Sequence, residues 1–287
     1  MQHILCDTDA GGDADDALAI LALLARRDVS LEGITLVPGN PAQVALVKLL
    51  CSEAGRPGIP VGVSSRWPGE RISRVTAPHL RLMSHYGVEG IRPPDADSLD
   101  ILKQALTDHP KDLTVLTLGP LHNIGWLLQE TDLGIERCVS MAGYWGGPGQ
   151  PRSEKEYNLN GCGWAARAYV ESDDRFGRRL MVGKNCTHQV KYDADFHETF
   201  RKSGDDNPAH RMIHELMSFS RSLEKKLHDP LAAAVAVNEE GVVSWSAEVR
   251  PEKHEGQWGC VEEPGSRIRA ATSVDLVAFR REFTRGA

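Results

Sequence analysis

The chain has 287 residues, of which 41% are hydrophobic and 25% charged, and it carries a net charge of −7. This length allows a large buried core, and the acidic balance argues against a nucleic-acid or membrane-surface partner, because both favour basic patches. The six cysteines are scattered without a CxxC pair, so we expect a thiol-reduced, cytoplasmic protein and no zinc site. We expect neither a membrane span, which needs roughly 18 apolar residues, nor a signal peptide ahead of residue 7.

Short apolar runs alternate with amphipathic stretches, which is typical of βα units that feed a mostly parallel sheet. Strands are predicted at 4–6, 32–37, 60–63, 113–118, 136–141 and 179–182. Helices are predicted at 15–26, 42–54, 120–129, 163–171, 208–223 and 230–238. Residues 242–275 are expected to form a β-rich tail. Because no repeat or linker divides the chain, residues 1–287 are predicted to form one α/β domain with a Rossmann-like sheet and helices on both faces.

One long segment fits neither periodicity. Residues 64–97 are rich in Pro, Gly, Ser and Arg, and this composition predicts a long loop region that could act as a mobile lid. The glycine-rich stretch 143–150 is predicted to be a second, shorter loop.

Five carboxylates lie within ten positions, where the first predicted strand ends and the first helix begins: Asp7, Asp9, Asp13, Asp15 and Asp16. Like charges this close repel one another, so packing alone does not explain them. Ca²⁺ or Mg²⁺ would, since both take carboxylate and carbonyl oxygens. The alternative is a set of helix caps in a solvated turn, and Asp13 fits that alternative best. The cluster predicts a metal-dependent enzyme.

A second polar junction is Leu227-His228-Asp229-Pro230. Proline favours the first turn of a helix, which leaves His228 and Asp229 where a loop meets a helix. Histidine is suited to proton transfer near neutral pH, whereas Asp229 alone could be an ordinary N-cap. Asp229 gains a functional role only if it meets the first cluster in space.

Two further features follow later strands. Residues 117–124 turn directly from a strand into a helix, where a free backbone carbonyl could bind a cation, although the segment alone is an ordinary βα turn. Glu156 and Asn158 could present neighbouring polar groups to sugar hydroxyls, or could be simple surface residues.

Taken together, the motifs form an ordered set. They are Asp7-Thr8-Asp9 with Asp15-Asp16, Val37-Pro38-Gly39-Asn40, Gly119-Pro120-Leu121-His122-Asn123, Met141-Ala142-Gly143, Glu156-Tyr157-Asn158, Thr187-His188 and His228-Asp229-Pro230-Leu231. This set, from residue 4 to about 236, resembles the nucleoside hydrolases of the inosine–uridine-preferring type. The linker between Asp9 and the Asp15-Asp16 pair is two residues longer than in many members.

The resemblance implies hydrolysis of a ribonucleoside to ribose and free base, with a single bound Ca²⁺. By matching position, the ligands of the ion would be Asp9, Asp16, the backbone carbonyl of Leu118 and Asp229. A bound water would lose its proton to Asp9 and attack an oxocarbenium-like ribose, and His228 would protonate the leaving base. The residues that would hold the ribose hydroxyls are Asp15, Asn40, Glu156 and Asn158, with Gln150 near the 5′-hydroxyl.

Base preference is not fixed by the resemblance, because residues 64–97 match it poorly. Either His79 or His85 could correspond to a base-side residue of the family. Four aromatic residues could stack on a base or simply pack: Trp67, Tyr86, Trp145 and Trp164. The family also implies a homodimer or homotetramer.

Two other classes stay open. A Mg²⁺-dependent phosphohydrolase would use Asp7 as nucleophile and Asp9 as acid/base, but Gly11 departs from that pattern and the later motifs would have no role. A non-catalytic nucleoside or ribose binder on the same scaffold would have lost a metal ligand or the base, and none is lost in the sequence. A modified nucleoside as substrate would keep the chemistry.

Overall fold

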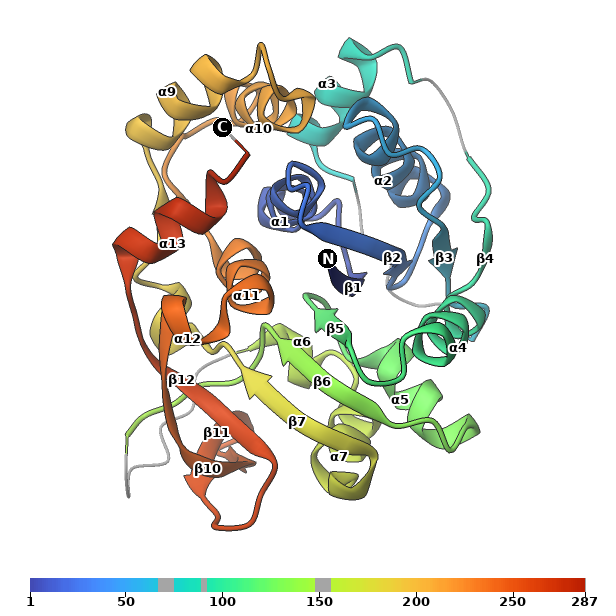
Figure 1. The fold of residues 1–287 in the computed structure, drawn as a ribbon, viewed down its shortest axis with the longest axis vertical. Helices are drawn as coiled ribbons and strands as arrows, with labels where there is room; N and C mark the ends of the chain where they lie inside the picture. Colours follow the sequence, from blue (N-terminus) through green and yellow to red (C-terminus); the bar gives the residue numbers. More distant parts are fainter. Residues whose placement is uncertain (67–74, 89–91, 148–155, 287) are drawn as a thin grey trace.

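The computed structural model describes residues 1–66, 75–88, 92–147 and 156–286. Its centre is a ten-stranded sheet in the order β11-β10-β12-β7-β6-β5-β1-β2-β3-β4 (Figure 1). The strands of this sheet are β1 (Gln2–Thr8), β2 (Val29–Leu36), β3 (Val61–Val63), β4 (Ala96–Asp97), β5 (Leu113–Thr117), β6 (Ile135–Ser140), β7 (Phe176–Met181), β10 (Val243–His254), β11 (Gln257–Glu262) and β12 (Ile268–Val274). A separate antiparallel pair joins β8 (Lys191–Tyr192) to β9 (Lys225–Lys226).

All neighbouring strands from β12 to β4 in this order run parallel, while β10 is antiparallel to both β11 and β12. The register places Asp7 of β1 beside Thr35 of β2 and Thr117 of β5. The carboxyl ends of these central strands therefore share one edge of the sheet, which is where ligands bind in folds of this kind.

Helices cover both faces of the sheet (Figure 1). The main helices are α1 (Ala14–Leu24), α2 (Pro41–Glu53), α3 (Ala77–His85), α4 (Ser98–Asp108), α5 (His122–Glu130), α7 (Gly163–Glu171), α9 (Ala194–Ser203), α10 (Pro208–Ser218), α11 (His228–Val237) and α13 (Leu276–Phe283). Short helical turns are α6 (Tyr157–Asn160), α8 (Lys184–Thr187), α12 (Glu239–Val242) and the 3-10 turn Asp173–Arg175. Helix α1 packs against α2, α10 and α11, while α5 packs against α4 and α7.

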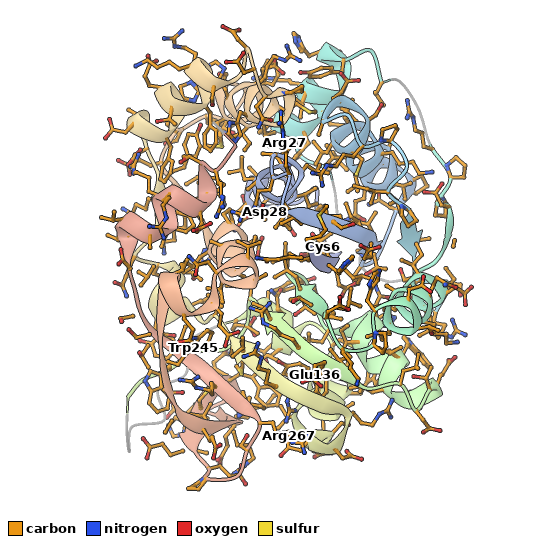
Figure 2. All side chains as sticks on the ribbon, in the orientation of Figure 1. Cys6, Arg27, Asp28, Glu136, Trp245 and Arg267 are labelled. Atoms are coloured by element: carbon orange, nitrogen blue, oxygen red, sulfur yellow. The ribbon has the colours of Figure 1, made fainter. Side chains whose placement is uncertain are left out.

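The two helical layers bury two apolar cores. One is centred on α1, α2, α10 and α11, and the other on α4, α5 and α7. Cys6 lies on the central strand in the interior of the molecule (Figure 2). All six cysteines are buried and carry free thiols. In the part of the chain that the structure describes, no helix combines the length and apolarity required to cross a bilayer.

The predicted fold class is confirmed, including the β-rich tail, which supplies β10, β11 and β12. The segment 64–97 differs from the predicted long loop, because it contains α3 and the short strand β4. Helix α3 forms because Leu82 and Met83 pack into the core beside α2 and α10. Leu80 of the same helix is half exposed, so the apolar residues of α3 do not form a clean amphipathic stripe in the sequence. Residues 67–74 and 89–91 of the segment lie outside the described residues.

Candidate active site

The acidic segment connects β1 to α1 at the carboxyl edge of the sheet. Strand β1 ends at Thr8, and α1 starts at Ala14 with Asp13 as its N-cap, accepting a hydrogen bond from the Ala14 amide. Asp15 and Asp16 lie in the first turn of α1, where the helix dipole favours negative charge. Asp13, which the sequence analysis interprets as a turn residue, therefore caps helix α1.

Three buried carboxylates converge from two helices. Oxygens of Asp15, Asp16 and Asp229 all lie within 4.8 Å of one another, and each side chain is buried. Asp229 is in the first turn of α11, which packs against α1. The structure thus brings Asp229 to the N-terminal cluster, the condition that separates a functional residue from an ordinary helix cap.

The buried carboxyl groups of this cluster have pKa values that a bound cation would lower. Burial raises the pKa values of Asp16 and Asp229 well above the usual range, and the neighbouring carboxylates raise them further. Burial and then the charge of Asp15 raise the pKa of Asp9 to about 7, and burial and Asp13 raise that of Asp15 to about 6. A bound divalent cation would remove this repulsion and stabilise the ionised forms.

Backbone groups from β5 approach the same point. A Cβ added at Gly119 would lie 2.8 Å from the amide nitrogen of Asp9, so only glycine allows this turn to pack against the acidic segment. The preceding residue, Leu118, donates its amide hydrogen bond to the carbonyl of Asp7 at 2.7 Å. The predicted ligand carbonyl of Leu118 therefore lies at the end of the strand next to β1.

Asn158 holds that carbonyl directly. Its side-chain nitrogen donates hydrogen bonds to the carbonyl oxygens of Leu118 at 2.6 Å and Met141 at 2.8 Å. The carboxylate of Glu156 accepts the backbone amides of Asn158 and Leu159, both at 2.7 Å. Burial raises the pKa of Glu156 to about 7, although these two hydrogen bonds oppose the rise. Both predicted ribose-binding residues therefore also organise the backbone of the site.

Asp7 has a different role from the exposed nucleophile of the phosphohydrolase alternative. The side chain is fully buried, and one oxygen accepts hydrogen bonds from Thr35 at 2.5 Å and Asn123 at 2.7 Å. Burial raises the pKa of Asp7 to about 7, against the effect of these bonds. Asp7 thus joins β1 to β2 and α5 from within the core.

Gln43 is a site residue that the sequence analysis missed. Its side-chain nitrogen donates to the carbonyls of Asp9 at 3.1 Å and Ala10 at 2.8 Å, and its oxygen accepts the amide of Asn40 at 3.0 Å. Asn40 in turn caps α2 through the amides of Ala42 and Gln43. The spacing of an Asn and a Gln around a helix start is a capping-box signal that could have identified Gln43.

His228 is held beside Asp229 by a neighbour from another motif. Its Nδ1 lies 2.7 Å from Oγ1 of Thr187, and its ring packs edge-on against His188 at a centroid distance of 5.5 Å. Burial, followed by His188 and nearby lysines, lowers the pKa of His228 to about 4. The imidazole is therefore neutral at pH 7.

A lysine missed by the sequence analysis borders the cluster. Lys225 forms an ion pair with Asp13. Burial lowers the pKa of Lys225, but Asp15 and Asp13 outweigh that effect, so the pKa is raised. Lys225 therefore neutralises part of the negative charge of the acidic cluster on the exposed side, at Asp13.

The N-cap of helix α3, Thr76, contacts the acidic segment: its backbone amide donates a hydrogen bond to the carbonyl of Gly11 at 2.9 Å. His79 is buried against Thr76, whereas His85 is half exposed and lies 3.7 Å from Glu215. Tyr86 donates to Glu215 at 2.6 Å.

The other predicted base-side and ribose-side residues divide into two groups. Trp145 is buried in the second core, and Trp164 packs against Trp126 at the surface. These contacts explain the positions of Trp145 and Trp164 by packing and do not indicate that either ring stacks on a base. Gln150 and Trp67 lie outside the described residues.

These features describe an enzyme of α/β type whose site, at the carboxyl edge of a parallel sheet, suits a hard cation. A family profile described as inosine-uridine preferring nucleoside hydrolase matches residues 4–281. The chain therefore belongs to that family, and its activity is hydrolysis of a nucleoside to ribose and free base, a glycosidase reaction.

Individual proteins are also similar to this chain. The chain is 26% identical over 294 residues to the pyrimidine-specific ribonucleoside hydrolase RihA of Citrobacter koseri, covering 95% of this chain and 88% of that protein. It is 31% identical over 199 residues to the uncharacterized protein C1683.06c of Schizosaccharomyces pombe, covering 65% of this chain and 62% of that protein. A solved plant nucleoside hydrolase, PpNRh1, has the same fold, with a TM-score of 0.76, 22% identity and 99% coverage of both chains.

Proposed function

We propose that this nucleoside hydrolase binds one Ca²⁺ at the carboxyl edge of the sheet and uses Asp9 as the general base. The observation that carries the proposal is the convergence of Asp15, Asp16 and Asp229, whose buried oxygens lie within 4.8 Å of one another. Asp9 is close enough for its charge to raise the pKa values of Asp16 and Asp229.

The donor set fits calcium. All the groups are oxygens, and Ca²⁺ takes six to eight of them in flexible geometry. The proposed ligands are Asp9, Asp16, Asp229 and the carbonyl of Leu118. Asn158 and Gln43 support this set by holding the backbone at Leu118 and Asp9. When bound, the cation would lower the pKa of a coordinated water.

Asp9 would accept the proton of the attacking water. Its partial exposure distinguishes it from the buried Asp7, Asp15 and Asp16. A base whose pKa lies near the working pH is the most effective, and the charge of a bound cation would adjust the value set by burial.

His228 would donate a proton to the leaving base. Donation requires the imidazolium form, because a neutral imidazole that lost its Nε2 proton would be left as an imidazolate. In the imidazolium form the Thr187 hydroxyl, 2.7 Å from Nδ1, would accept a hydrogen bond from that nitrogen. The ribose would be held by Asp15, Asn40, Glu156 and Asn158, with Gln150 near the 5′-hydroxyl.

Three broader features belong to the same proposal. The six free thiols support a reducing, cytoplasmic setting. A homodimer or homotetramer is proposed from the family resemblance. Uridine is the first substrate to test, because a relative is named pyrimidine-specific.

The test is release of free ribose from a panel of ribonucleosides and p-nitrophenyl riboside, with and without a calcium chelator. We expect chelator-sensitive release that returns on addition of Ca²⁺. Full activity in chelator would contradict the metal-assisted mechanism. Calcium binding without turnover of any substrate would favour the binder alternative or a modified nucleoside, and phosphate release from a phosphomonoester would favour the phosphohydrolase.

A further inference from the structure

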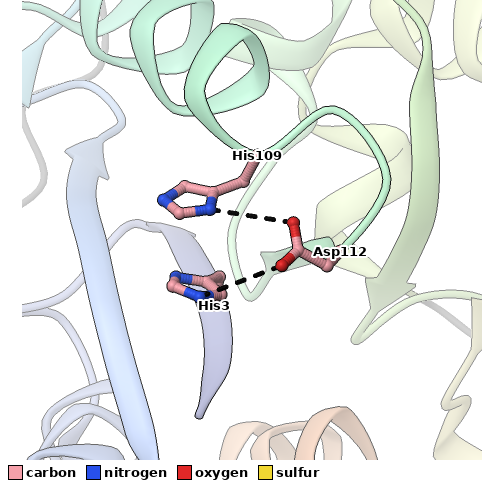
Figure 3. A group of neighbouring side chains, drawn as sticks. All are labelled: His3, His109 and Asp112. Atoms are coloured by element: carbon pink, nitrogen blue, oxygen red, sulfur yellow. Dashed lines mark ion pairs between the residues drawn. The ribbon is translucent and has the colours of Figure 1, made fainter.

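A second group of metal-ligating side chains lies at the opposite edge of the sheet. His3 is the second residue of β1, the strand that ends at the acidic segment. His109 is the C-cap of α4, and Asp112 directly precedes β5. Figure 3 shows the two imidazoles stacked above one another with Asp112 beside both. Their centroids are 3.8 Å apart and their planes differ by 21°. Nitrogen and oxygen atoms of the three residues lie within 4.8 Å of one another.

Each ring presents one nitrogen to Asp112 and the other to Glu32 of β2. Nε2 of His3 and Nδ1 of His109 lie 3.9 and 3.7 Å from the two oxygens of Asp112 (Figure 3). On the far side, Nδ1 of His3 lies 2.7 Å and Nε2 of His109 3.5 Å from the oxygens of Glu32. His3 therefore forms a hydrogen bond with Glu32, and the nitrogen atoms of both rings that face Asp112 are separated from it by a wider gap.

This arrangement matches the pattern of metal-binding histidines. A ligating imidazole typically donates its outer N–H to a carboxylate, which fixes the tautomer and turns the other nitrogen toward the ion. Burial raises the pKa of Glu32, but hydrogen bonds from Ser30 and His3 and the nearby His109 outweigh it and lower the pKa. Glu32 is thus an ionised acceptor for His3, and its second oxygen lies 3.5 Å from His109.

We propose that His3, His109 and Asp112 form a binding site for a first-row transition-metal cation such as Zn²⁺, with Glu32 orienting the two imidazoles. Ligands 2.0–2.2 Å from a tetrahedral ion lie roughly 3.3–3.6 Å from one another. The gaps of 3.7 and 3.9 Å to Asp112 close to that range by small side-chain movements. The stacked rings must tilt apart so that both lone pairs meet the ion. Asp112, with a side chain 64% exposed, can adjust and leaves a position for water.

The donor chemistry separates this site from the acidic cluster. Imidazole nitrogen suits Zn²⁺, Ni²⁺ and Cu²⁺, whereas carboxylate and carbonyl oxygens suit Ca²⁺. The site uses no cysteine, which is why the scattered cysteines gave no sign of it. It also lies away from the reacting edge, so its expected effect is structural: an ion there would link β1, β2 and the turn between α4 and β5, and would stabilise the folded state by mass action.

The test uses metal-stripped full-length protein with Ca²⁺ in excess, so that the acidic cluster is saturated. Zn²⁺ is titrated by calorimetry, Co²⁺ by visible absorption, and thermal unfolding is followed with and without Zn²⁺. We expect one site with the absorption of nitrogen-ligated Co²⁺ and a Zn²⁺-dependent rise in Tm. His3→Ala and His109→Ala should lose both, and Glu32→Gln should weaken binding by roughly 10–100-fold.

The exposed His254 on β10 provides a matched control, since His254→Ala removes an imidazole far along the chain from this group. It should bind like the wild type. Ribose release in Ca²⁺ should stay unchanged in His3→Ala and His109→Ala, which shows that these variants fold. Zn²⁺ affinity and Tm shift in His109→Ala equal to those of the wild type would overturn the proposal, as would wild-type protein that binds no Zn²⁺ under these conditions.

Discussion

The side-chain amide of Asn158 donates a 2.6 Å hydrogen bond to the carbonyl oxygen of Leu118, which the proposed mechanism assigns to the metal. A carbonyl has two lone pairs, so one can accept this bond while the other faces a cation. The second bond from Asn158, to Met141, ties the end of β5 to the end of β6. Asn158 is therefore a positioning residue for the metal site as well as a proposed ribose contact.

Replacing Asn158 should weaken calcium binding as well as substrate binding. Removal of a group that orients a metal ligand typically costs 10–100-fold in affinity or activity, and we expect Asn158→Ala to fall in that range. Asn158→Asp should be worse, because its carboxylate would face two carbonyl oxygens. Calcium affinity measured without substrate checks this. Unchanged affinity alongside a raised KM would restrict Asn158 to the ribose.

Asp9→Asn should abolish most turnover while leaving the fold intact. The variant removes the proposed proton acceptor and one charge from the metal site, and loss of a general base typically costs 10²–10⁴-fold. Ribose release should be measured at saturating Ca²⁺, with circular dichroism as the control for folding. Wild-type turnover under these conditions would exclude Asp9 as the base.

Asp16→Asn should raise the stability of the metal-free protein and weaken its stabilisation by calcium. Without a metal, the substitution removes a buried charge that Asp9 and Asp15 repel, while Thr8 keeps its acceptor. We therefore expect chelated Asp16→Asn to be more stable than the chelated wild type, by about 0.5–2 kcal/mol. Calcium should stabilise the wild type much more than this variant, since binding at 100 times Kd adds about 2.7 kcal/mol.

Asp13→Asn is the matched control for that prediction. Asp13 has a side chain that is 57% exposed, and Asn caps helices as well as Asp does. Turnover and calcium affinity should stay close to wild type. A loss comparable to that of Asp16→Asn would move Asp13 into the metal site.

His228→Ala should discriminate between substrates by their leaving groups. Natural nucleosides need a proton on the departing base, whereas p-nitrophenolate leaves without one, so the loss should be far larger for uridine than for p-nitrophenyl riboside. Thr187→Val should show a weaker form of the same pattern, because the 2.7 Å contact with Nδ1 is lost. Equal losses on both substrates would mean that His228 is not the leaving-group acid.

The predictable parts of the structure are those encoded locally. Apolar runs located the central strands, and carboxylates placed directly after β1 predicted the acidic site, because parallel strands share one carboxyl edge. The proximity of Asp229 to Asp16 depends on α11 packing against α1, more than 200 residues apart in sequence. Only the resemblance to a family suggested that pair in advance.

The missed features depend on tertiary contacts. Helices α3, α4, α9 and α13 were not predicted, and α3 in particular is defined by packing against α10 rather than by a strong local pattern. Gln43 and Lys225 acquire roles only when α2 and β9 approach the acidic segment. Asp7 would be the nucleophile only in the phosphohydrolase alternative, and its depth in the core is a property of the folded sheet.

The C-terminal helix is fastened by a buried ion pair that makes stability depend on pH. Arg26, just after α1, donates to Glu282 of α13 at 2.9 Å, and both side chains are 2% exposed. Burial raises the pKa of Glu282, but hydrogen bonds from Arg26 and Asn238 outweigh it and hold the pKa below its ordinary value. A lowered carboxyl pKa contributes stability above the unfolded pKa, and that contribution is lost as pH falls through the folded pKa.

Glu282→Gln should therefore destabilise the protein at pH 7, but by less than the roughly 3 kcal/mol that follows when a buried charge loses every partner, because Arg26 keeps its hydrogen bonds to Asp28. The difference from wild type should persist down to about pH 4.3, the ordinary value for Glu, and shrink below it. Urea unfolding across this range checks the prediction. A pH-independent difference would show that packing of α13, and not the ion pair, sets its stability.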